Sequence, residues 1–184
     1  MDDIVRQAMT KWPQVPDCFG WLGLNARGNW YMRDEQAQAA GAFDSGQPGA
    51  KGAMLQHEKL IAFIQRNYAL DELGRAYFQN GPQRVFVELE VTPWVWRIGP
   101  EAKVRAHSGQ EVQVRLCVLD EAGRVYLLTN LGLGLVHTQD VPQAADLLQA
   151  GYWPLQEERA ADLPRRYGYV RSPQRDSLRA GPAG

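Results

Sequence analysis

The sequence predicts an α+β protein with mainly antiparallel sheet and a few packed helices, which could divide into two small sub-domains. Strand-like runs come in blocks separated by turns that contain Gly, Asn or Pro, and they do not alternate one by one with helices. Hydrophobic residues make up 45% of the 184 residues and charged residues 22%, which is an ordinary globular composition. A chain of this length and composition can bury a substantial core.

The N-terminal part is predicted to begin with a helix and a hairpin. Apolar residues recur at roughly helical spacing over residues 3–12, and Pro13 ends this helix. The stretch FGWLGLNARGNWYMRD then predicts strands near 19–24 and 29–33 around a turn at Asn25–Gly28. Asn and Gly can supply the positive φ angles that a tight hairpin turn needs.

Two segments of contrasting composition follow the hairpin. Residues 34–53 are rich in Ala, Gly and Gln, and Phe43 is their one large apolar residue. Such a segment buries too little surface to offset its ordering entropy, so we expect a mobile loop. Residues 54–68 have apolar side chains on one side and polar side chains on most of the other, which predicts an amphipathic helix.

Most of the sheet is predicted to lie in the middle of the chain. Turn signals separate strand-like runs at 76–79, 85–91, 94–98, 103–107, 111–119 and 124–129. Asp140 as the N-cap and Pro142 in the first turn predict a helix over 141–150. A short charged helix near 156–162 and a strand-like run at 167–170 complete this part.

These patterns suggest a division of the chain into three regions. The N-terminal α+β part is expected to cover residues 1–98 and to include the mobile loop. The C-terminal α+β part is expected to cover residues 99–170. Residues 171–184 are polar and contain Gly and Pro, which is typical of a flexible tail.

The order of features also resembles a known family. A hairpin with a G-N-W-Y tip precedes the helix HEKLIAFIQRNY and the segment LGRAYFQNGPQRVFVELEVTPWVW. This layout resembles an uncharacterised proteobacterial family of unknown function. It is also similar to a second uncharacterised bacterial family, which has a D-G-W hairpin and a D-A-P-F-V-A stretch.

The resemblance covers about residues 18–130 and implies a two-part α+β fold without an established activity. The second family's stretch corresponds to Val91-Thr92-Pro93-Trp94-Val95-Trp96 in this chain. Since Val91 and Thr92 stand where that family has Asp-Ala, an acidic role at this point is not carried over.

Two glutamates in the strand-like run before Pro93 are the first candidates for chemistry. Alternate residues of a strand share a face, so Glu88 and Glu90 are expected together on the outer face, roughly 7 Å apart. This spacing overlaps that of glycoside hydrolase acid pairs, which makes a hydrolase using Glu88 and Glu90 one hypothesis. The alternative is a solvated face whose acids pair with neighbouring arginines, and we favour it because glycosidase acids usually come from different elements.

Pro93 marks a second candidate region, because proline cannot donate to a strand ladder and indicates an edge, bend or bulge. Trp94 and Trp96 alternate after it and could be either a hydrophobic anchor or the wall of a groove, and the anchor is the favoured interpretation. Arginine donors beside such a groove could hold an anionic group. The candidate ligand-binding residues are Tyr77, Arg84, Trp94, Trp96 and Arg97.

Other motifs give no catalytic or cofactor site. His57, His107 and His137 are isolated and lack metal-ligand spacing, so no metal is predicted. Cys18 and Cys117 lie far apart in apolar contexts, typical of buried thiols, and no serine lies in a G-x-S-x-G motif. The glycines of LGLGLVHTQD lack the third glycine of a dinucleotide site, so no cofactor is predicted, and they are expected to allow a close backbone approach.

A basic stretch near the C-terminus supports a second alternative function. Arg165, Arg166, Arg171 and Arg175 are interleaved with tyrosines, a combination that can bind single-stranded nucleic acid. The upstream acids can neutralise this stretch, and the formal net charge of the chain is −1, so nucleic-acid binding is not expected to dominate.

The sequence therefore favours a non-enzymatic module that binds a small molecule or a protein partner, although it leaves open whether any reaction is catalysed. No apolar run approaches the length of a membrane span, and no basic region followed by an apolar one opens the chain. A cytoplasmic location without membrane partners is expected. The ligand, the partner and the oligomeric state are not indicated by any motif.

Overall fold

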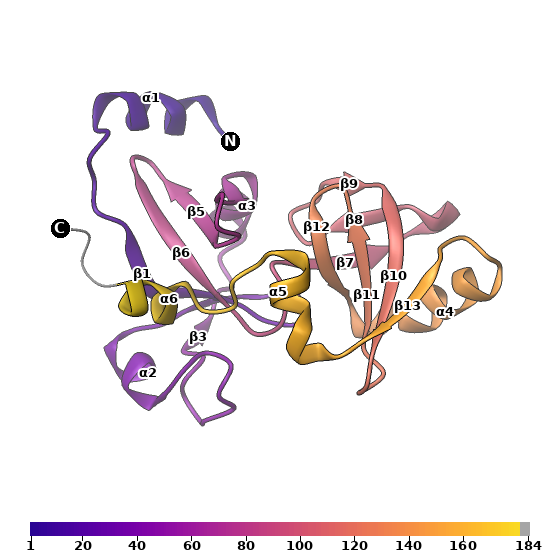
Figure 1. Cartoon of the computed structure of the whole chain (residues 1–184). Coiled ribbons are helices and arrows are strands. Elements are labelled where there is room, and N and C mark those ends of the chain that lie inside the picture. The colour runs from indigo at the N-terminus through magenta and orange to yellow at the C-terminus, as the bar shows by residue number, and fades with distance from the viewer. Residues whose placement is uncertain (181–184) are drawn as a thin grey trace. The chain divides into compact units, whose positions relative to one another are not determined.

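The computed structural model describes residues 1–180, which form two compact units (Figure 1). Unit 1 comprises residues 1–25, 29–91 and 169–180, and unit 2 comprises residues 92–168 together with Ala26–Gly28. Each unit contains one sheet in which antiparallel neighbours outnumber parallel ones. The predicted α+β class with mainly antiparallel sheets is confirmed.

The division between the units lies between Val91 and Thr92, a few residues before the boundary expected near residue 98. The physical reason is strand pairing. β7 (Trp94–Ile98) lies between β12 (Gly132–Val136) and β8 (Val104–Ala106), so it belongs to the sheet of the second unit.

The sheet of unit 1 has six strands in the order β3-β2-β1-β6-β5-β4. In chain order they are β1 (Cys18–Leu24), β2 (Trp30–Met32), β3 (Ala53–Met54), β4 (Tyr68–Leu70), β5 (Ala76–Asn80) and β6 (Gln83–Leu89). The expected hairpin is present as β1 and β2, and the β5–β6 hairpin turns at Gly81 with a φ of 57°. The two central strands, β1 and β6, run parallel.

Four helices accompany this sheet: α1 (Asp3–Lys11), α2 (Glu35–Ala40), α3 (Glu58–Arg66) and α6 (Pro173–Ala180). α3 packs on one face, where the ring of Phe63 meets that of Phe78 edge-on at 5.5 Å. α6 packs on the other face, where the backbone N–H of Gln174 donates to Glu88. Because both faces are covered, residues 86–89 of β6 are buried on both sides and do not show the polar outer face that the sequence predicts.

Two segments are more ordered than composition predicts. Residues 34–53, expected to be a mobile loop, contain α2 and three buried apolar residues, Ala37, Phe43 and Ala50. Residues 171–184, expected to be a flexible tail, contain α6, while residues 181–184 lie outside the described part. In both cases long-range contacts supply the stabilisation that local sequence lacks.

The sheet of unit 2 has seven strands in the order β13-β10-β11-β12-β7-β8-β9. Besides β7, β8 and β12 they are β9 (Glu111–Val112), β10 (Val114–Asp120), β11 (Val125–Thr129) and β13 (Leu155–Glu158). Residues 156–158 of the charged helix expected near 156–162 belong instead to β13, because this strand pairs in parallel with β10. The remainder of that helix is the short turn η3 (Ala160–Asp162).

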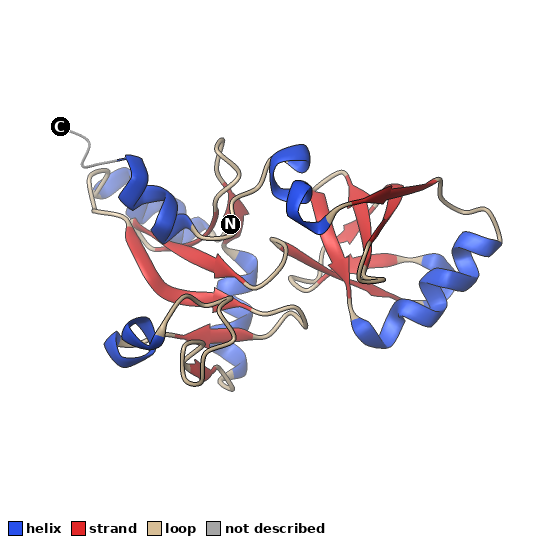
Figure 2. Cartoon of the chain, turned by 60° about the horizontal axis from the view of Figure 1, so that its bottom comes forward, coloured by secondary structure: helices blue, strands red, loops and turns tan. Residues whose placement is uncertain are grey.

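The other helical elements of unit 2 are η1 (Pro100–Ala102), η2 (Thr138–Asp140), α4 (Val141–Gln149) and α5 (Leu163–Tyr167). Figure 2 shows helices in blue and strands in red for both units. α4 confirms the helix predicted over 141–150, but Asp140 makes no side-chain cap to it. Its carboxylate instead accepts hydrogen bonds from Arg97 and from the backbone N–H of Ile98. No helix among residues 1–180 is long and apolar enough to cross a membrane.

Candidate functional site

The five residues predicted to line one groove fall in different units. Tyr77 and Arg84 belong to unit 1, whereas Trp94, Trp96 and Arg97 belong to β7 of unit 2. Arg84 is held in a two-bond ion pair with Asp17 and lies over the ring of Tyr77 at 5.9 Å. The five side chains therefore do not form a single site within either unit.

The two tryptophans of β7 are buried and leave no open platform. Trp94 is 4% exposed and Trp96 is 0% exposed, and their rings stack with centroids 6.0 Å apart. Each indole N–H donates to a backbone carbonyl, that of Leu131 or Leu127. A Cβ atom at Gly134 would lie 2.5 Å from the ring of Trp96, so only glycine allows this strand to approach. These contacts agree with the favoured anchor interpretation and provide no groove wall.

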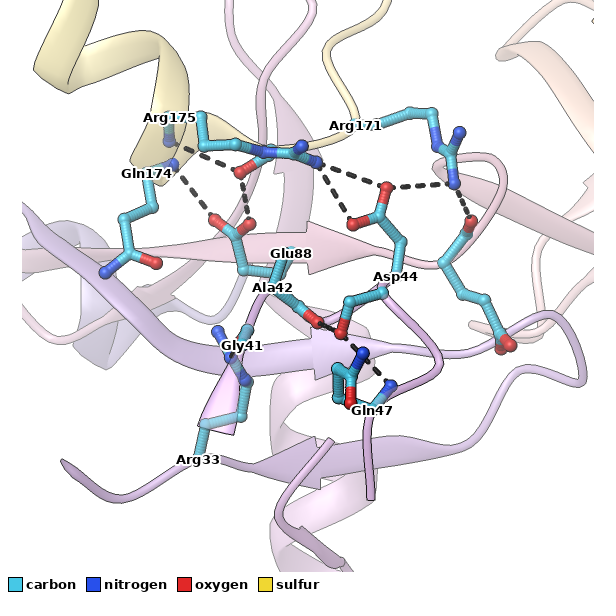
Figure 3. Close-up of polar contacts among 12 residues, drawn as sticks. Arg33, Gly41, Ala42, Asp44, Gln47, Glu88, Arg171, Gln174 and Arg175 are labelled. Atoms are coloured by element: carbon cyan, nitrogen blue, oxygen red, sulfur yellow. Dashed lines mark hydrogen bonds and ion pairs between the residues drawn. The ribbon is translucent and has the colours of Figure 1, made fainter. Parts of the chain in front are cut away.

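Glu88, expected on the solvent face of its strand, is instead 2% exposed. Its Oε2 accepts a hydrogen bond from the Ser172 hydroxyl at 2.5 Å, and its Oε1 accepts one from the Gln174 backbone N–H at 2.9 Å (Figure 3). Burial raises the pKa of Glu88, while these hydrogen bonds and the charge of Arg33 oppose the rise. The carboxylate thus lies at the N-terminus of α6, where the helix dipole favours a negative charge by about 0.3–1 kcal/mol.

Arg33 is a second buried charge near Glu88 and is 1% exposed. Its guanidinium donates from Nε to the carbonyl of Ala50 at 2.8 Å, from Nη1 to that of Gly20 at 3.2 Å and from Nη2 to that of Gly41 at 2.6 Å. Burial lowers the pKa of Arg33, and the charges of Glu88 and Asp44 oppose this. The side chain therefore fastens residues 34–53 to the sheet.

Asp44 links the same segment to the C-terminal region. Its carboxylate pairs with both Arg171 and Arg175 at 3.1 Å (Figure 3). Arg171 also donates to the backbone carbonyl of Glu90, whose own side chain pairs with Lys51 at 2.6 Å. We call Arg33, Asp44, Glu88, Arg171, Ser172, Gln174 and Arg175 the Glu88 network.

The Glu88 network has the contacts of a structural cluster rather than those of a catalytic one. Both oxygens of Glu88 accept hydrogen bonds within the chain, and Glu90 is engaged by Lys51. In unit 1, across the described residues, His57 is the sole histidine, and it is exposed and caps α3. Ser172 therefore has no imidazole base, which a serine nucleophile usually needs. This geometry disfavours a hydrolase that uses Glu88 and Glu90.

The remaining candidate groups are the two histidines of unit 2 and the two cysteines. Burial lowers the pKa of His107 to about 3 and raises that of Cys117 to about 11. His137 accepts a hydrogen bond from the backbone N–H of Gln139 at the start of η2. Cys18 and Cys117 are free thiols. Within residues 1–180 no group of three or more His, Cys, Asp or Glu side chains could hold a metal ion.

The C-terminal arginines do not form one basic surface within either unit. Arg165 and Arg166 belong to unit 2 and pair with Asp162 and Glu158, whereas Arg171 and Arg175 belong to unit 1 and pair with Asp44. Arg166, Arg171 and Arg175 each pair with a carboxylate that is at most 16% exposed, so three of the four arginines are held in pairs that water screens little.

An apolar groove in unit 1 was not predicted from the sequence. It lies between α3 and one face of the sheet and encloses about 190 Å³. Three of its large apolar side chains are well exposed: Trp21 at 40%, Met32 at 44% and Leu60 at 39%. Its lining also includes Leu22, Phe63, Ile64, Phe78, Asn80 and Val85. We call this set of residues the apolar groove.

The groove owes its position to an irregularity in β1. The pairing of β1 with β6 shifts register between Cys18 and Leu22, so Trp21 and Leu22 both reach the same cavity although they are adjacent. Leu22 of the groove pairs with Met32 and Val87, whereas the next residue, Gly23, pairs with Glu88. Because paired residues share a face, the groove and the Glu88 network lie on opposite faces of one sheet.

The fold and these contacts define a two-unit α+β protein with the Glu88 network and an apolar groove in unit 1. A family model described as "Protein of unknown function (DUF2946)" matches residues 1–174, and the chain belongs to this family. The resemblance to an uncharacterised family is therefore confirmed.

Among solved structures, the chain is similar to a DUF1285 family protein from Silicibacter pomeroyi, determined at 2.50 Å resolution. The two share 13% sequence identity with a TM-score of 0.48, over 80% of this chain and 85% of that one. No curated protein matches the sequence.

Proposed function

We propose that this protein is a non-enzymatic, partner-binding module whose apolar groove receives one apolar side chain of another protein. The observation that supports this is the clustering of three exposed large apolar side chains, Trp21, Met32 and Leu60, around a single cavity. Exposed apolar residues are common singly, but a group that borders a concavity is typical of a binding surface.

The size of the groove supports a side chain as its occupant. Pockets for small molecules usually enclose about 300–1,000 Å³, whereas this groove encloses about 190 Å³. An apolar cavity of about 150 Å³ can hold a benzene ring, so the space suits one Phe-sized or Leu-sized group. A partner that presents such a residue would bury it as the anchor of a larger interface.

The test uses side-chain analogues as probes and methionine methyl groups as reporters. The chain has four methionines, Met1, Met9, Met32 and Met54, and only Met32 lines the groove among those the structure describes. With 13C-methyl labelling, toluene is expected to shift the Met32 signal alone. Trp21→Ala should weaken that shift at least fivefold, whereas Trp12→Ala, which changes an exposed tryptophan of the α1 C-cap, should not.

A second probe distinguishes a partner's side chain from a free small molecule. N-acetyl-phenylalaninamide carries the same ring on a peptide unit, and it should bind at least as tightly as toluene if the groove accepts a side chain. Binding of toluene together with exclusion of the amide would contradict a partner-binding role. If neither probe shifted the Met32 signal, the proposal that the apolar groove is a binding site would be contradicted.

We also place the protein in the cytoplasm. The support is its two free cysteines, which are typical of a reducing compartment. Fractionation of cells that produce the tagged protein tests this, and recovery from an oxidising compartment or from a membrane fraction would contradict it.

A further inference from the structure

We propose a second binding site, in unit 2, for a small molecule that carries a phosphate group. The site is the outward face of the β7–β8 hairpin, where Arg97, Lys103 and Arg105 line a cavity of about 380 Å³. It is separate in residues and chemistry from the apolar groove of unit 1 and does not depend on the function proposed for that groove.

The hairpin register brings two of the cations directly opposite one another. Arg97 pairs with Arg105, while Trp96 pairs with Ala106 and Ile98 with Val104. The alternating residues Trp96, Ile98, Val104 and Ala106 are buried, so the arginines lie on the outer face. Directly opposed like charges destabilise a strand pair, and a bound anion would relieve that repulsion.

Each of the three cations pairs with an acid, but none of these acids lines the cavity. Asp140 is 10% exposed and holds Arg97 through two hydrogen bonds, at 2.6 and 3.2 Å, which also raise the pKa of Arg97. The pairs Lys103–Glu101 at 3.5 Å and Arg105–Glu111 at 3.6 Å join side chains that are more than half exposed.

Such exposed pairs are weak because water screens them. Lys103 and Arg105 can therefore turn toward a ligand. Arg97, in contrast, is held in place by the largely buried carboxylate of Asp140. The three charged residues of the cavity lining are all cations.

The turn of the hairpin is held in an unusual backbone conformation. Glu101 and Ala102 have φ angles of 56° and 57°, a left-handed conformation that residues other than glycine rarely adopt. Hydrogen bonds from the Gly99 N–H to the Lys103 carbonyl and from the Gln143 side chain to the Gly99 carbonyl fix this turn. The turn returns the chain so that Lys103 joins Arg105 on the cationic face.

The dimensions and chemistry of the cavity favour a phosphorylated small molecule. Its volume lies within the range of small-molecule pockets, about 300–1,000 Å³. Guanidinium groups match phosphate oxygens in a forked geometry, and an ammonium group adds a point charge. Ile98 and Pro100 contribute apolar surface beside the cations, which suits an organic group attached to the phosphate.

The experiment titrates phenyl phosphate into the full-length protein at low ionic strength and follows backbone amide signals by NMR. Amides of Arg97–Arg105 are expected to shift, with tighter binding for phenyl phosphate than for inorganic phosphate because of the apolar surface. Arg105→Gln should weaken binding about tenfold. Arg115→Gln, which removes an exposed arginine of β10 in the same sheet, should leave it unchanged.

A second variant and a second ligand complete the experiment. Lys103→Gln should also weaken binding several-fold, and the amide spectrum of each variant reports directly that it is folded. Equal weakening by Arg115→Gln would show diffuse charge attraction and overturn the site. So would tighter binding of an oligothymidine than of phenyl phosphate, or shifts that lie away from the β7–β8 hairpin.

Discussion

β7 of unit 2 and β6 of unit 1 are both buried, but they are stabilised by different chemistry. β7 contributes two stacked indoles whose N–H groups each find a carbonyl. β6 contributes a carboxylate, Glu88, which is covered by a helix distant in sequence. Apolar burial is non-directional, whereas a buried charge is tolerated only when its partners are in place. The difference shows that a carboxylate in a predicted strand need not be a catalytic group.

The largest expected effect tests the apolar side of this comparison. Trp96→Ala should lower the free energy of unfolding by about 3–5 kcal/mol, the usual cost of truncating a buried large aromatic residue. It also leaves the carbonyl of Leu127 without its indole donor. Denaturant titration measures the change, with Trp12→Ala as an exposed control that should alter stability by less than about 0.5 kcal/mol. A stable Trp96 variant would mean that β7 is not a core strand.

The next effect tests the charged side. Arg33→Met keeps much of the side-chain volume but removes the donors to four backbone carbonyls, that of Ala37 included, and the positive charge near Glu88. Each buried group left without a partner costs about 1–3 kcal/mol, so a total loss of about 3 kcal/mol or more is expected.

The matched control for that change is Arg84→Met. Arg84 is 39% exposed and pairs with Asp17, and such a surface pair contributes only about 0–1 kcal/mol. Equal losses for the two variants in denaturant titration would contradict the structural role of Arg33.

The smallest expected effect is a change in pH dependence. The folded-state pKa of Glu88 is raised above the ordinary value of 4.5, so the folded protein keeps this proton to higher pH than the unfolded chain does. The contribution of Glu88 to stability is therefore greatest below pH 4.5 and falls as pH rises from there through the folded-state pKa.

Glu88→Gln removes this titration. The stability of the wild type relative to the variant should thus fall with increasing pH over that window. Parallel stability profiles for the two proteins would show that burial does not perturb Glu88.

Local sequence signals predicted the elements that depend on local interactions. The β1–β2 hairpin and α4 follow from turn residues, proline placement and periodicity. The boundary of α6 also had a signal, because Ser172-Pro173 is a typical cap and first-turn pair, but nothing local indicates that this helix covers Glu88. That contact joins residues 84 positions apart.

The sites, like the fold, could be predicted only where local sequence patterns indicate them. Arg97 was predicted as an anion contact, and the alternation of Arg97, Lys103 and Arg105 around a short turn was a usable signal for the cationic cavity. The apolar groove had no comparable signal. It depends on a register shift in β1 and on the packing of α3, which single-residue patterns do not reveal. Asp140 was expected to cap α4, but its tertiary contacts with Arg97 and Ile98 prevail.

We propose that unit 1 binds through its apolar groove and uses Glu88 only for structure. The most direct measurement is the 13C-methyl methionine spectrum of the wild type and of Glu88→Gln during titration with toluene. Because Met32 and Glu88 lie on opposite faces of the sheet, we predict the same shift of Met32 in both proteins, with Met9 and Met54 unmoved. A Met32 signal that does not respond to toluene, or a response abolished by Glu88→Gln in a protein that remains folded, would contradict the claim.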